Sequence, residues 1–276
     1  MESLGRLFIF IGLVLCWTVV LSYDEIQTTL LEEWRTSNVD FQSNSCLKKS
    51  MVFDNEAFFD HLANTNPVPH GGGAWYPRDK VTGFLTKASL VLPSGDIVET
   101  GVHTGHSSWI IMRLLLDYDN CKKRYWAFDS FDGFPPKTEK DGVWGRPSQL
   151  HEMAYAQQKF EKNLKDAQVW DENVIVVTKG YFNDTLPHAK IDAISFLRAD
   201  GDLFVSTWDS LTNLYHKVVP GGFVYIDDFG SFEGCRHAVN MFRAKHHIYE
   251  PMNFVRNEND ITFIKFEALW WQKRKK

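Results

Sequence analysis

The clearest pattern of apolar and polar positions lies in the second half of the chain. An apolar stretch, Ala193–Leu197, ends in the acidic turn Asp200-Gly201-Asp202. Positions with helical spacing follow from Trp208 to Val218, and a second apolar stretch, Phe223–Ile226, ends in Asp227-Asp228. This order predicts a strand, a helix and a second strand, which together form a parallel β-α-β unit.

The same alternation extends over most of the chain. Further helices are expected at Val81–Val91, Trp109–Leu116 and Gly234–Lys245, and further strands at Asp96–Glu99, Tyr125–Phe128, Val174–Val177, Tyr249–Val255 and Ile261–Phe266. Because strands alternate with helices, the sequence predicts an α/β fold on a mostly parallel sheet. The last two strands have no helix between them, so we expect them to close the sheet edge as an antiparallel hairpin.

Four carboxylates come directly after two of these strands: Asp200, Asp202, Asp227 and Asp228. The carboxyl ends of parallel strands meet at one edge of the sheet, where open α/β sheets bind ligands. Like charges that converge there need a counter-charge, because they cannot all stay ionised without one. A hard divalent cation such as Mg²⁺, with oxygen ligands, is the simplest answer. The alternative is plain turn chemistry, which Asp also favours and which suits Asp202 best.

A turn with two glycines, Glu99-Thr-Gly101-Val-His-Thr-Gly105, joins an expected strand to an expected helix. Glycine lets the backbone pass close to a ligand, and the helix start offers free N–H groups. We expect Ser107 or Ser108 to cap that helix. The turn is neither G-x-G-x-x-G nor a P-loop, which disfavours dinucleotides and nucleoside triphosphates. Asp129 ends the next strand, where a carboxylate typically binds ribose hydroxyls, so the two features together predict an adenosine-bearing ligand.

Composition narrows the choice of partners. The 276 residues suffice for one large domain, and the net charge of −5 comes without a basic stripe, so no nucleic-acid partner is expected. The four cysteines, Cys16, Cys46, Cys121 and Cys235, contain no C-x-x-C pair, which disfavours a zinc site or a redox dithiol. Cys16 lies in an apolar N-terminal segment, so we expect at most one intramolecular disulfide among the other three.

The N-terminus is interpreted as a targeting segment. Leu7–Leu21 carries no charge and follows Arg6, and it is short for a full membrane span. Residues 1–22 therefore suit a signal peptide or a short signal anchor. We expect this segment to contact the membrane and to direct the chain into the secretory pathway, either as a lumenal ER or Golgi domain or, after cleavage, as a secreted protein. Asn183 would there be a formal glycosylation acceptor.

Residues 23–79 are expected to form a polar stem and lead-in, with short helices at Glu25–Trp34 and Glu56–Leu62. The glycine-rich segment His70–Tyr76 is either a lid over a pocket or a plain connector. We expect the catalytic domain to span residues 80–268. Residues 269–276 are expected to be a basic, solvated tail.

Several motifs, in this order, resemble the macrocin O-methyltransferase (TylF-type) family. They are Val98-Glu99-Thr100-Gly101-Val102, Ala127-Phe128-Asp129-Ser130-Phe131-Asp132-Gly133-Phe134-Pro135, Lys179-Gly180-Tyr181-Phe182 with Asp184-Thr185-Leu186-Pro187, Leu197-Arg198-Ala199-Asp200-Gly201-Asp202-Leu203, Ser206-Thr207-Trp208-Asp209-Ser210-Leu211 and Gly221-Gly222-Phe223-Val224-Tyr225-Ile226-Asp227-Asp228-Phe229. The likeness extends over about residues 96–243.

The resemblance implies a fold, a reaction and a set of site residues. The fold is the Rossmann-like class I methyltransferase sheet of seven strands, with the last one antiparallel. The reaction is methylation of a sugar hydroxyl, dependent on S-adenosylmethionine and Mg²⁺. Asp200, Asp227 and Asp228 are expected to hold the metal, and Asp200 is also expected to act as the base. The residues expected at the cofactor are Glu99, Gly101, Gly105, Ser107, Asp129 and Ser130, with Asp184 at the adenine end.

The glycine turn departs from the family pattern, which has an aromatic and a basic residue followed by two glycines. This chain has His103-Thr104-Gly105-His106, and a side chain at His106 is expected to narrow the turn. Because the chain carries a targeting segment, we expect the acceptor to be a sugar of a lumenal glycan or glycolipid rather than a macrolide. The alternatives are a metal-dependent glycosyltransferase that uses Asp200-x-Asp202 and a catalytically silent binding protein of the same fold; a homo-oligomer is compatible with each.

Overall fold

The computed structural model describes residue 46 and residues 56–69, 76–119, 121–142, 157–256 and 266–274. A seven-stranded sheet forms its centre, in the order β3-β2-β1-β4-β5-β7-β6. The strands are β1 (Asp96–Thr100), β2 (Tyr125–Asp129), β3 (Ile175–Lys179), β4 (Ile194–Ala199), β5 (Val218–Ile226), β6 (Asn253–Arg256) and β7 (Phe266–Gln272). The first five are parallel, and β7 is antiparallel to both of its neighbours. The expected α/β sheet with one antiparallel strand is therefore confirmed.

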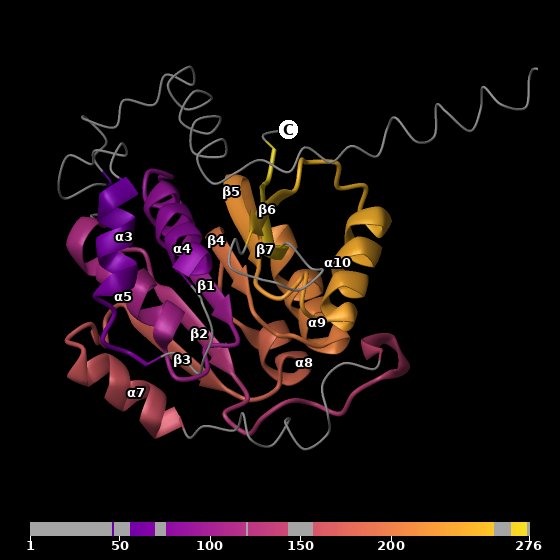
Figure 1. Ribbon diagram of the computed structural model, residues 1–276, viewed down its shortest axis with the longest axis horizontal. Coiled ribbons are helices and arrows are strands. Elements are labelled where there is room, and N and C mark those ends of the chain that lie inside the picture. Colours follow the sequence, from indigo (N-terminus) through magenta and orange to yellow (C-terminus); the bar gives the residue numbers. More distant parts are fainter. Residues whose placement is uncertain are drawn as a thin grey trace, which may run out of the picture.

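Helices cover both faces of this sheet (Figure 1). On one face lie α3 (Glu56–Asn64), α4 (Tyr76–Ser89), α5 (His106–Tyr118) and α7 (Gln157–Asp166); on the other lie α8 (Phe182–Thr185), α9 (Phe204–Leu214) and α10 (Glu233–Lys245). Three short 3-10 turns, η1 (Glu139–Asp141), η2 (Leu186–His188) and η3 (Tyr215–Lys217), complete the described elements. Each face buries its own apolar cluster, as expected for a parallel sheet covered on both sides.

The register of the central strands sets the position of the site. Glu99 on β1 is paired with Arg198 on β4, and Arg198 is paired with Tyr225 on β5. Asp200 and Asp227 follow the last residues of β4 and β5, so both begin at the same edge of the sheet. The close approach of β1 and β4 also fixes Gly101: its φ is +90°, and a Cβ there would lie 1.7 Å from the carbonyl oxygen of Asp200.

The expected domain boundary at residue 80 is wrong, because it falls inside α4. This helix begins at Tyr76, and its residues Arg78, Asp79 and Lys80 are buried although they are charged. They have partners elsewhere in the fold, including Asp227 for Arg78 and Asp60 on α3 for Lys80. The lead-in also has a covalent link to the sheet domain through the disulfide Cys46–Cys121, which is compatible with the expectation of at most one intramolecular disulfide.

The expected solvated tail from residue 269 is also wrong. Residues 266–272 form β7, which lies between β5 and β6, and Trp270 and Trp271 are 1% and 0% exposed. Two aromatic side chains buried on opposite faces of a strand outweigh the charge of the few basic residues that follow. The strand expected at Ile261–Phe266 lies outside the described residues, except for Phe266.

Several other expectations concern residues outside the described ranges. They are the targeting segment 1–22, the helix at Glu25–Trp34 and the lid or connector His70–Tyr76, of which only Tyr76 is described. Among the helices that are described, none combines the length and the apolar character needed to cross a bilayer.

Candidate functional site

A cavity of about 760 Å³ opens at the carboxyl edge of the sheet. All four acids that follow β4 and β5 line it, together with Gly101, Asp129 and Ser130 from the ends of β1 and β2. The opposite walls are largely aromatic and apolar: Phe134, Pro135, Pro136, Tyr181, Phe182, Val205 and Phe232. The acids after β4 and β5 and the residues at the ends of β1 and β2 therefore line the same cavity, at the edge of the sheet where the sequence predicted them.

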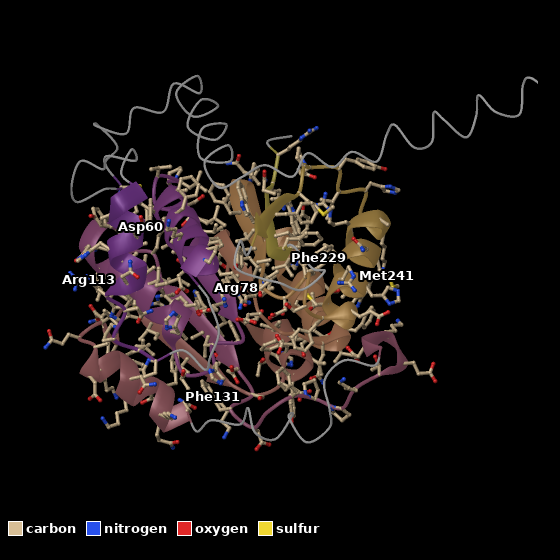
Figure 2. All side chains as sticks on the ribbon, viewed as in Figure 1. Asp60, Arg78, Arg113, Phe131, Phe229 and Met241 are labelled. Carbon is tan, nitrogen blue, oxygen red and sulfur yellow. A yellow bond between two sulfur atoms is a disulfide. The ribbon has the colours of Figure 1, made fainter. Side chains whose placement is uncertain are left out.

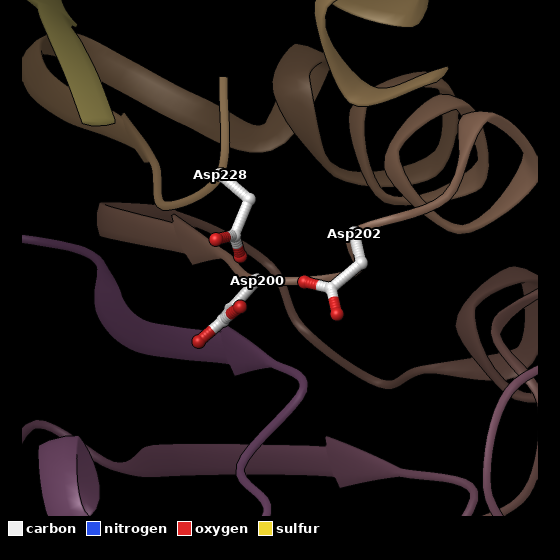
Figure 3. Close-up of side chains that lie close together, drawn as sticks. All are labelled: Asp200, Asp202 and Asp228. Atoms are coloured by element: carbon white, nitrogen blue, oxygen red, sulfur yellow. The ribbon is translucent and has the colours of Figure 1, made fainter. Parts of the chain in front are cut away.

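Three carboxylates form a compact cluster in this cavity (Figure 3). Ligand atoms of Asp200, Asp202 and Asp228 lie within 4.8 Å of one another. Asp228 and Asp202 are 7% and 9% exposed, and the Asp200 side chain is 25% exposed, toward the cavity. Asp202 has a φ of +56°, a backbone conformation that Asp tolerates better than most residues. Oxygen donors this close together fit a hard divalent cation.

Asp227 is not a member of this cluster, although it was expected to bind the metal. Its Oδ1 accepts hydrogen bonds from Arg198 at 2.8 Å and from the Tyr225 hydroxyl at 2.9 Å, and its Oδ2 accepts one from Arg78 at 2.8 Å. Both oxygens are therefore engaged by protein groups. The geometry replaces Asp227 with Asp202 as the third candidate ligand.

Two buried arginines supply the positive charge beneath the acids. Arg198 on β4 contacts Glu99 at 2.9 Å, Asp200 at 2.7 Å and Asp227. Arg78, which is labelled in Figure 2, enters from α4 and contacts Asp227, Asp228 at 3.5 Å and Glu267 at 3.1 Å. Burial alone would lower the pKa of each guanidinium, but the neighbouring carboxylates outweigh it and raise both.

In the acid cluster, the surroundings favour the uncharged form of the carboxyl groups. Burial, followed by repulsion from Asp227, raises the pKa of Asp200 to about 7. Burial also raises the pKa of Asp202 and, together with the other acids, raises that of Asp228 well above its ordinary value. Carboxyl groups that resist ionisation in this way gain most from a bound cation.

The glycine turn is held by Asp129. Its Oδ2 accepts backbone N–H groups of Val102 and His103 at 2.9 and 3.0 Å, and its Oδ1 accepts that of Phe131 at 2.8 Å. The carboxylate therefore fixes the turn that lines the cavity beside it. It remains at the cavity wall, where the expected contact with ribose hydroxyls requires it to be.

Glu99 does not reach the cavity, contrary to expectation. Its carboxylate is completely buried and accepts hydrogen bonds from Ser107 at 2.5 Å, Ser108 at 3.0 Å, the Tyr125 hydroxyl and Arg198. The expected helix cap by Ser107 or Ser108 is wrong for the same reason. Helix α5 begins earlier, at His106 after Gly105, and both serine hydroxyls point to Glu99.

Gly105 and Ser107 also lie outside the large cavity. Gly105 has a φ of +94°, and a Cβ there would lie 3.1 Å from the ring of Phe160, so this glycine serves the packing of α7 against the turn. Ser107 lines a second, small cavity of about 40 Å³ behind Asp200, together with Arg78, Arg198 and Gly101. This polar space is large enough for water.

His106 points away from the large cavity, so its side chain does not narrow the turn as expected. Its Nδ1 lies 2.7 Å from the carbonyl oxygen of Val68, and its Nε2 lies 2.9 Å from Asp79. His103 lines both cavities. Burial lowers the pKa of His103. Burial also opposes the charge of His106, but the hydrogen bond to Asp79, the negative charge of Asp79 and the hydrogen bond to Val68 together outweigh burial and raise the pKa of His106.

Ser130 and Asp184 both line the large cavity, as expected. The Ser130 hydroxyl donates to the carbonyl of Gly133 at 2.5 Å, and Asp184 accepts a hydrogen bond from the Asn183 amide at 2.9 Å. Asp184 lies on α8, which follows β3. It therefore lies on the same half of the sheet as Asp129.

Sequence reasoning missed Arg78, Arg198 and the pair His106–Asp79. A signal for Arg198 was present, because it is the only charged residue in the strand Ile194–Ala199, where Ser195 is the only other polar residue, and a charge in such a position requires a partner. For Arg78 the sequence offers no such signal, since its partners Asp227 and Asp228 follow it by 149 and 150 positions.

The chain is similar to several known proteins. A family model described as Macrocin-O-methyltransferase (TylF) matches residues 89–272. Demethyldecarbamoylnovobiocin O-methyltransferase of Streptomyces niveus is 36% identical over 183 residues, which cover 65% of this chain and 66% of that protein. A 4'-O-methyltransferase of Streptomyces olivaceus that acts on 8-demethyl-8-(2,3-dimethoxy-alpha-L-rhamnosyl)-tetracenomycin-C is 36% identical over 163 residues, with 58% and 62% coverage.

The chain thus spans just under two thirds of the length of each of these two relatives. Among solved structures, the O-methyltransferase NovP superposes with a TM-score of 0.62 at 26% identity, covering 90% of this chain and all of NovP. The fold is therefore that of the α/β methyltransferases. Since the family model covers residues 89–272 of the 276, the chain belongs to the macrocin-O-methyltransferase (TylF) family.

Proposed function

We propose that this chain transfers a methyl group from S-adenosylmethionine to a sugar hydroxyl, with a divalent cation such as Mg²⁺ held by its acids. One observation carries the proposal: the acid cluster Asp200, Asp202 and Asp228 lines the same cavity as the glycine turn and Asp129. The family membership supplies the reaction class. It also favours methyl transfer over the glycosyl transfer that the Asp200-x-Asp202 motif left open.

The cofactor is assigned to the half of the cavity above β1, β2 and β3. Gly101 and Ser130 line that half with Asp129, which is in place to accept the ribose hydroxyls, and Asp184 marks the adenine end. Glu99, Gly105 and Ser107 support the turn from behind instead of contacting the cofactor. This half of the cavity adjoins the acids, as transfer between two bound molecules requires.

The residues fit a divalent metal, with a set that differs from the expected one. Asp200, Asp202 and Asp228 would hold the cation, and Asp227 keeps the two arginines in place beneath it. A bound cation supplies Lewis acidity and positive charge beside the acids. The chemistry of the donor set is all oxygen, which suits Mg²⁺ or Mn²⁺ rather than a softer metal.

The chain's own residues then orient the acceptor and remove its proton. Asp200 is the acid cluster's most exposed member toward the cavity, so its carboxylate is accessible to an acceptor hydroxyl bound there. Asp200 would accept the proton of the acceptor hydroxyl on a carboxylate oxygen. Bound S-adenosylmethionine would supply the methyl group, and it would leave as S-adenosylhomocysteine once its methyl carbon–sulfur bond is broken. The apolar wall residues Phe134, Pro135 and Pro136 would reduce the access of water to the group that is transferred.

The acceptor is proposed to be a sugar of a glycan or glycoconjugate. The names of two relatives include a rhamnosyl 4'-hydroxyl and a mycinamicin 3''-hydroxyl as their sites of methylation. In this chain the aromatic walls at Tyr181, Phe182 and Phe232 can stack on the apolar face of a sugar ring. The wide cavity also leaves room for more than the cofactor alone.

The secretory pathway is proposed as the location, with membrane contact through residues 1–22. The disulfide Cys46–Cys121 supports an oxidising compartment, because such bonds persist in secreted proteins and are rare in the cytosol. A glycan acceptor is abundant in the same compartment.

The test uses the full chain expressed through the secretory pathway of eukaryotic cells. Calorimetry with S-adenosylmethionine and with a sugar nucleotide separates the two enzyme classes. Transfer of a deuterated methyl group to a panel of neutral p-nitrophenyl glycosides, read by mass spectrometry with Mg²⁺ or with EDTA, then tests the acceptor and the metal. We expect cofactor binding and Mg²⁺-dependent labelling; absence of heat at high micromolar S-adenosylmethionine, or binding of the sugar nucleotide alone, would refute the proposal.

A further inference from the structure

Residues 130–142, which we call the strap, run from the end of β2 along the large cavity to the starts of α9 and α10. Its middle residues Phe134, Pro135 and Pro136 line the cavity. Consecutive prolines fix the backbone of this middle part, because each ring restricts φ. The strap is thus a stiff wall whose position depends on its two ends.

The first end is anchored in the core. Phe131 is 5% exposed and its ring centroid lies 5.7 Å from that of Phe160, and its backbone N–H donates to Asp129. This end therefore moves with the glycine turn and the cofactor half of the cavity.

The second end is anchored by a buried carboxylate, Asp141, which is 3% exposed. Its Oδ2 accepts the backbone N–H of Thr138 at 2.7 Å and the Thr138 hydroxyl at 2.9 Å. Its Oδ1 accepts the backbone N–H of Phe204 at 2.5 Å, across 63 positions of sequence. Phe204 is the first residue of α9, whose own preceding residue, Leu203, offers no capping side chain. Asp141 on the strap therefore caps the N-terminus of α9 in place of the N-cap residue's own side chain.

The packing between this end of the strap and the start of α10 is close. A Cβ on Gly234, at the start of α10, would lie 2.2 Å from Asp141 Oδ1, and one on Gly142 would lie 2.1 Å from Glu233 Oε2. Lys140 adds a contact, with its ammonium 4.2 Å above the Phe204 ring. The strap is thus docked on two helix starts, and α9 begins two residues after Asp202 of the acid cluster.

We propose that Asp141 is a positioning residue that sets the distance between the strap's apolar wall and the acid cluster, and thereby shapes the acceptor side of the cavity. The effect on acceptor binding rests on the proposed methyl transfer, whereas the contacts of Asp141 with the strap and α9 do not depend on it. The carboxylate touches neither the acids nor the cofactor half. Its loss should therefore change acceptor binding and leave cofactor binding intact.

The experiment compares Asp141→Ala, Asp141→Asn and the unchanged full chain. Asn keeps one acceptor oxygen of similar shape, so it should retain part of the function. Asp171→Ala is the matched control: Asp171 also holds a turn, accepting Asn173 N–H at 2.9 Å, but it precedes β3 at the opposite edge of the sheet. Hydrogen–deuterium exchange, calorimetry with S-adenosylhomocysteine, and KM and kcat with the best p-nitrophenyl glycoside are measured for each.

For Asp141→Ala we expect faster exchange in peptides of residues 138–142 and 201–208 only. The acceptor KM should rise by about tenfold, with a smaller fall in kcat and a dissociation constant for S-adenosylhomocysteine within about threefold. Asp141→Asn should lie between the two, and Asp171→Ala should change none of these values. Unchanged exchange at the start of α9, or equal loss of cofactor and acceptor binding, would overturn the proposal. If no glycoside is methylated, the sugar assignment fails, while exchange and cofactor binding still decide the role of Asp141.

Discussion

Replacing Arg198 with Met is expected to destabilise the fold strongly, even in a chain freed of metal by EDTA. The guanidinium is buried and binds three carboxylates, on Glu99, Asp200 and Asp227, at 2.7–2.9 Å. Met fills a similar volume without charge, so the main effect is the loss of the counter-charge. Glu99 and Asp227 are 0% and 2% exposed and cannot regain solvent without a rearrangement.

The magnitude follows from this burial. Removing one partner of a buried ion pair costs about 3–5 kcal/mol, because the other charge is left without compensation. The Ser107, Ser108 and Tyr125 hydroxyls still bind Glu99, and Arg78 still binds Asp227, so we expect the lower end, about 3 kcal/mol. For a domain of this size that corresponds to a fall in Tm of roughly 6–12 °C.

The assay is urea unfolding followed by circular dichroism at fixed pH. Arg113→Met is the matched control, because Arg113 also binds a carboxylate through two N–H groups, on Asp117 at 2.8 and 2.9 Å, but its side chain is 43% exposed. An exposed pair of this kind contributes about 0.3–0.5 kcal/mol. Combining Arg198→Met with Glu99→Gln should recover about 1 kcal/mol, since the two sites are coupled. Equal losses for the two arginine variants, or strict additivity of the double variant, would refute the electrostatic reasoning.

Four further outcomes are expected. Asp200→Asn should abolish methyl transfer and leave cofactor affinity within about threefold. The control Asp192→Asn, at an exposed position before β4, should change neither value. Methyl transfer retained by Asp200→Asn would show that Asp200 is not the base. Gly101→Ala should prevent stable folding at 37 °C, because its Cβ would lie 1.7 Å from a carbonyl oxygen at a φ of +90°; a normal melting curve would contradict that close approach. Replacing both Cys46 and Cys121 with Ser should lower the free energy of unfolding by about 2–4 kcal/mol, as measured against the unchanged chain with and without reductant. The pKa of Asp200 is raised to about 7, so between about pH 4 and pH 7 its carboxyl binds more protons in the native state than in the unfolded state, and the stability of the metal-free chain should fall as pH rises over that range. Mg²⁺ should therefore raise Tm more at pH 8 than at pH 5. Equal shifts in Tm at both pH values would argue against a metal at these acids.

The order of strands and helices could be predicted because the signal is local. Apolar stretches broken by Gly, Pro and Asp gave β1, β2, β3 and β4 within two residues of their observed bounds, whereas β5 begins at Val218, five residues before the expected Phe223. The tail could not be predicted in this way. The basic residues after Trp271 suggested solvent, whereas the position of β7 between β5 and β6 is a property of the whole sheet. Apart from its apolar residues, the local sequence of a strand does not indicate that both of its faces are buried.

In the site, sequence predicted which acids gather but not how they divide their roles. The carboxyl ends of β4 and β5 bring Asp200, Asp202, Asp227 and Asp228 to one cavity, as the β-α-β pattern required. Which acids can bind a ligand depends on Arg198, which is in register with Glu99. Arg198 forms ion pairs with Glu99 and Asp227, so these two carboxylates are not available to a ligand. A register between strands that lie 99 positions apart cannot be read from spacing.

The unusual glycine turn and the misplaced domain boundary have one physical explanation. His106, which stands where the family pattern has glycine, turns its ring toward Val68 and Asp79, and Asp79 lies beside Arg78 on α4. The larger side chain therefore binds the lead-in to the turn. Through Arg78 the same helix contacts Asp227 and Asp228 at the far side of the site. Both contacts come from residues before the family match begins at residue 89, so the unit that holds the acids in place must include α4.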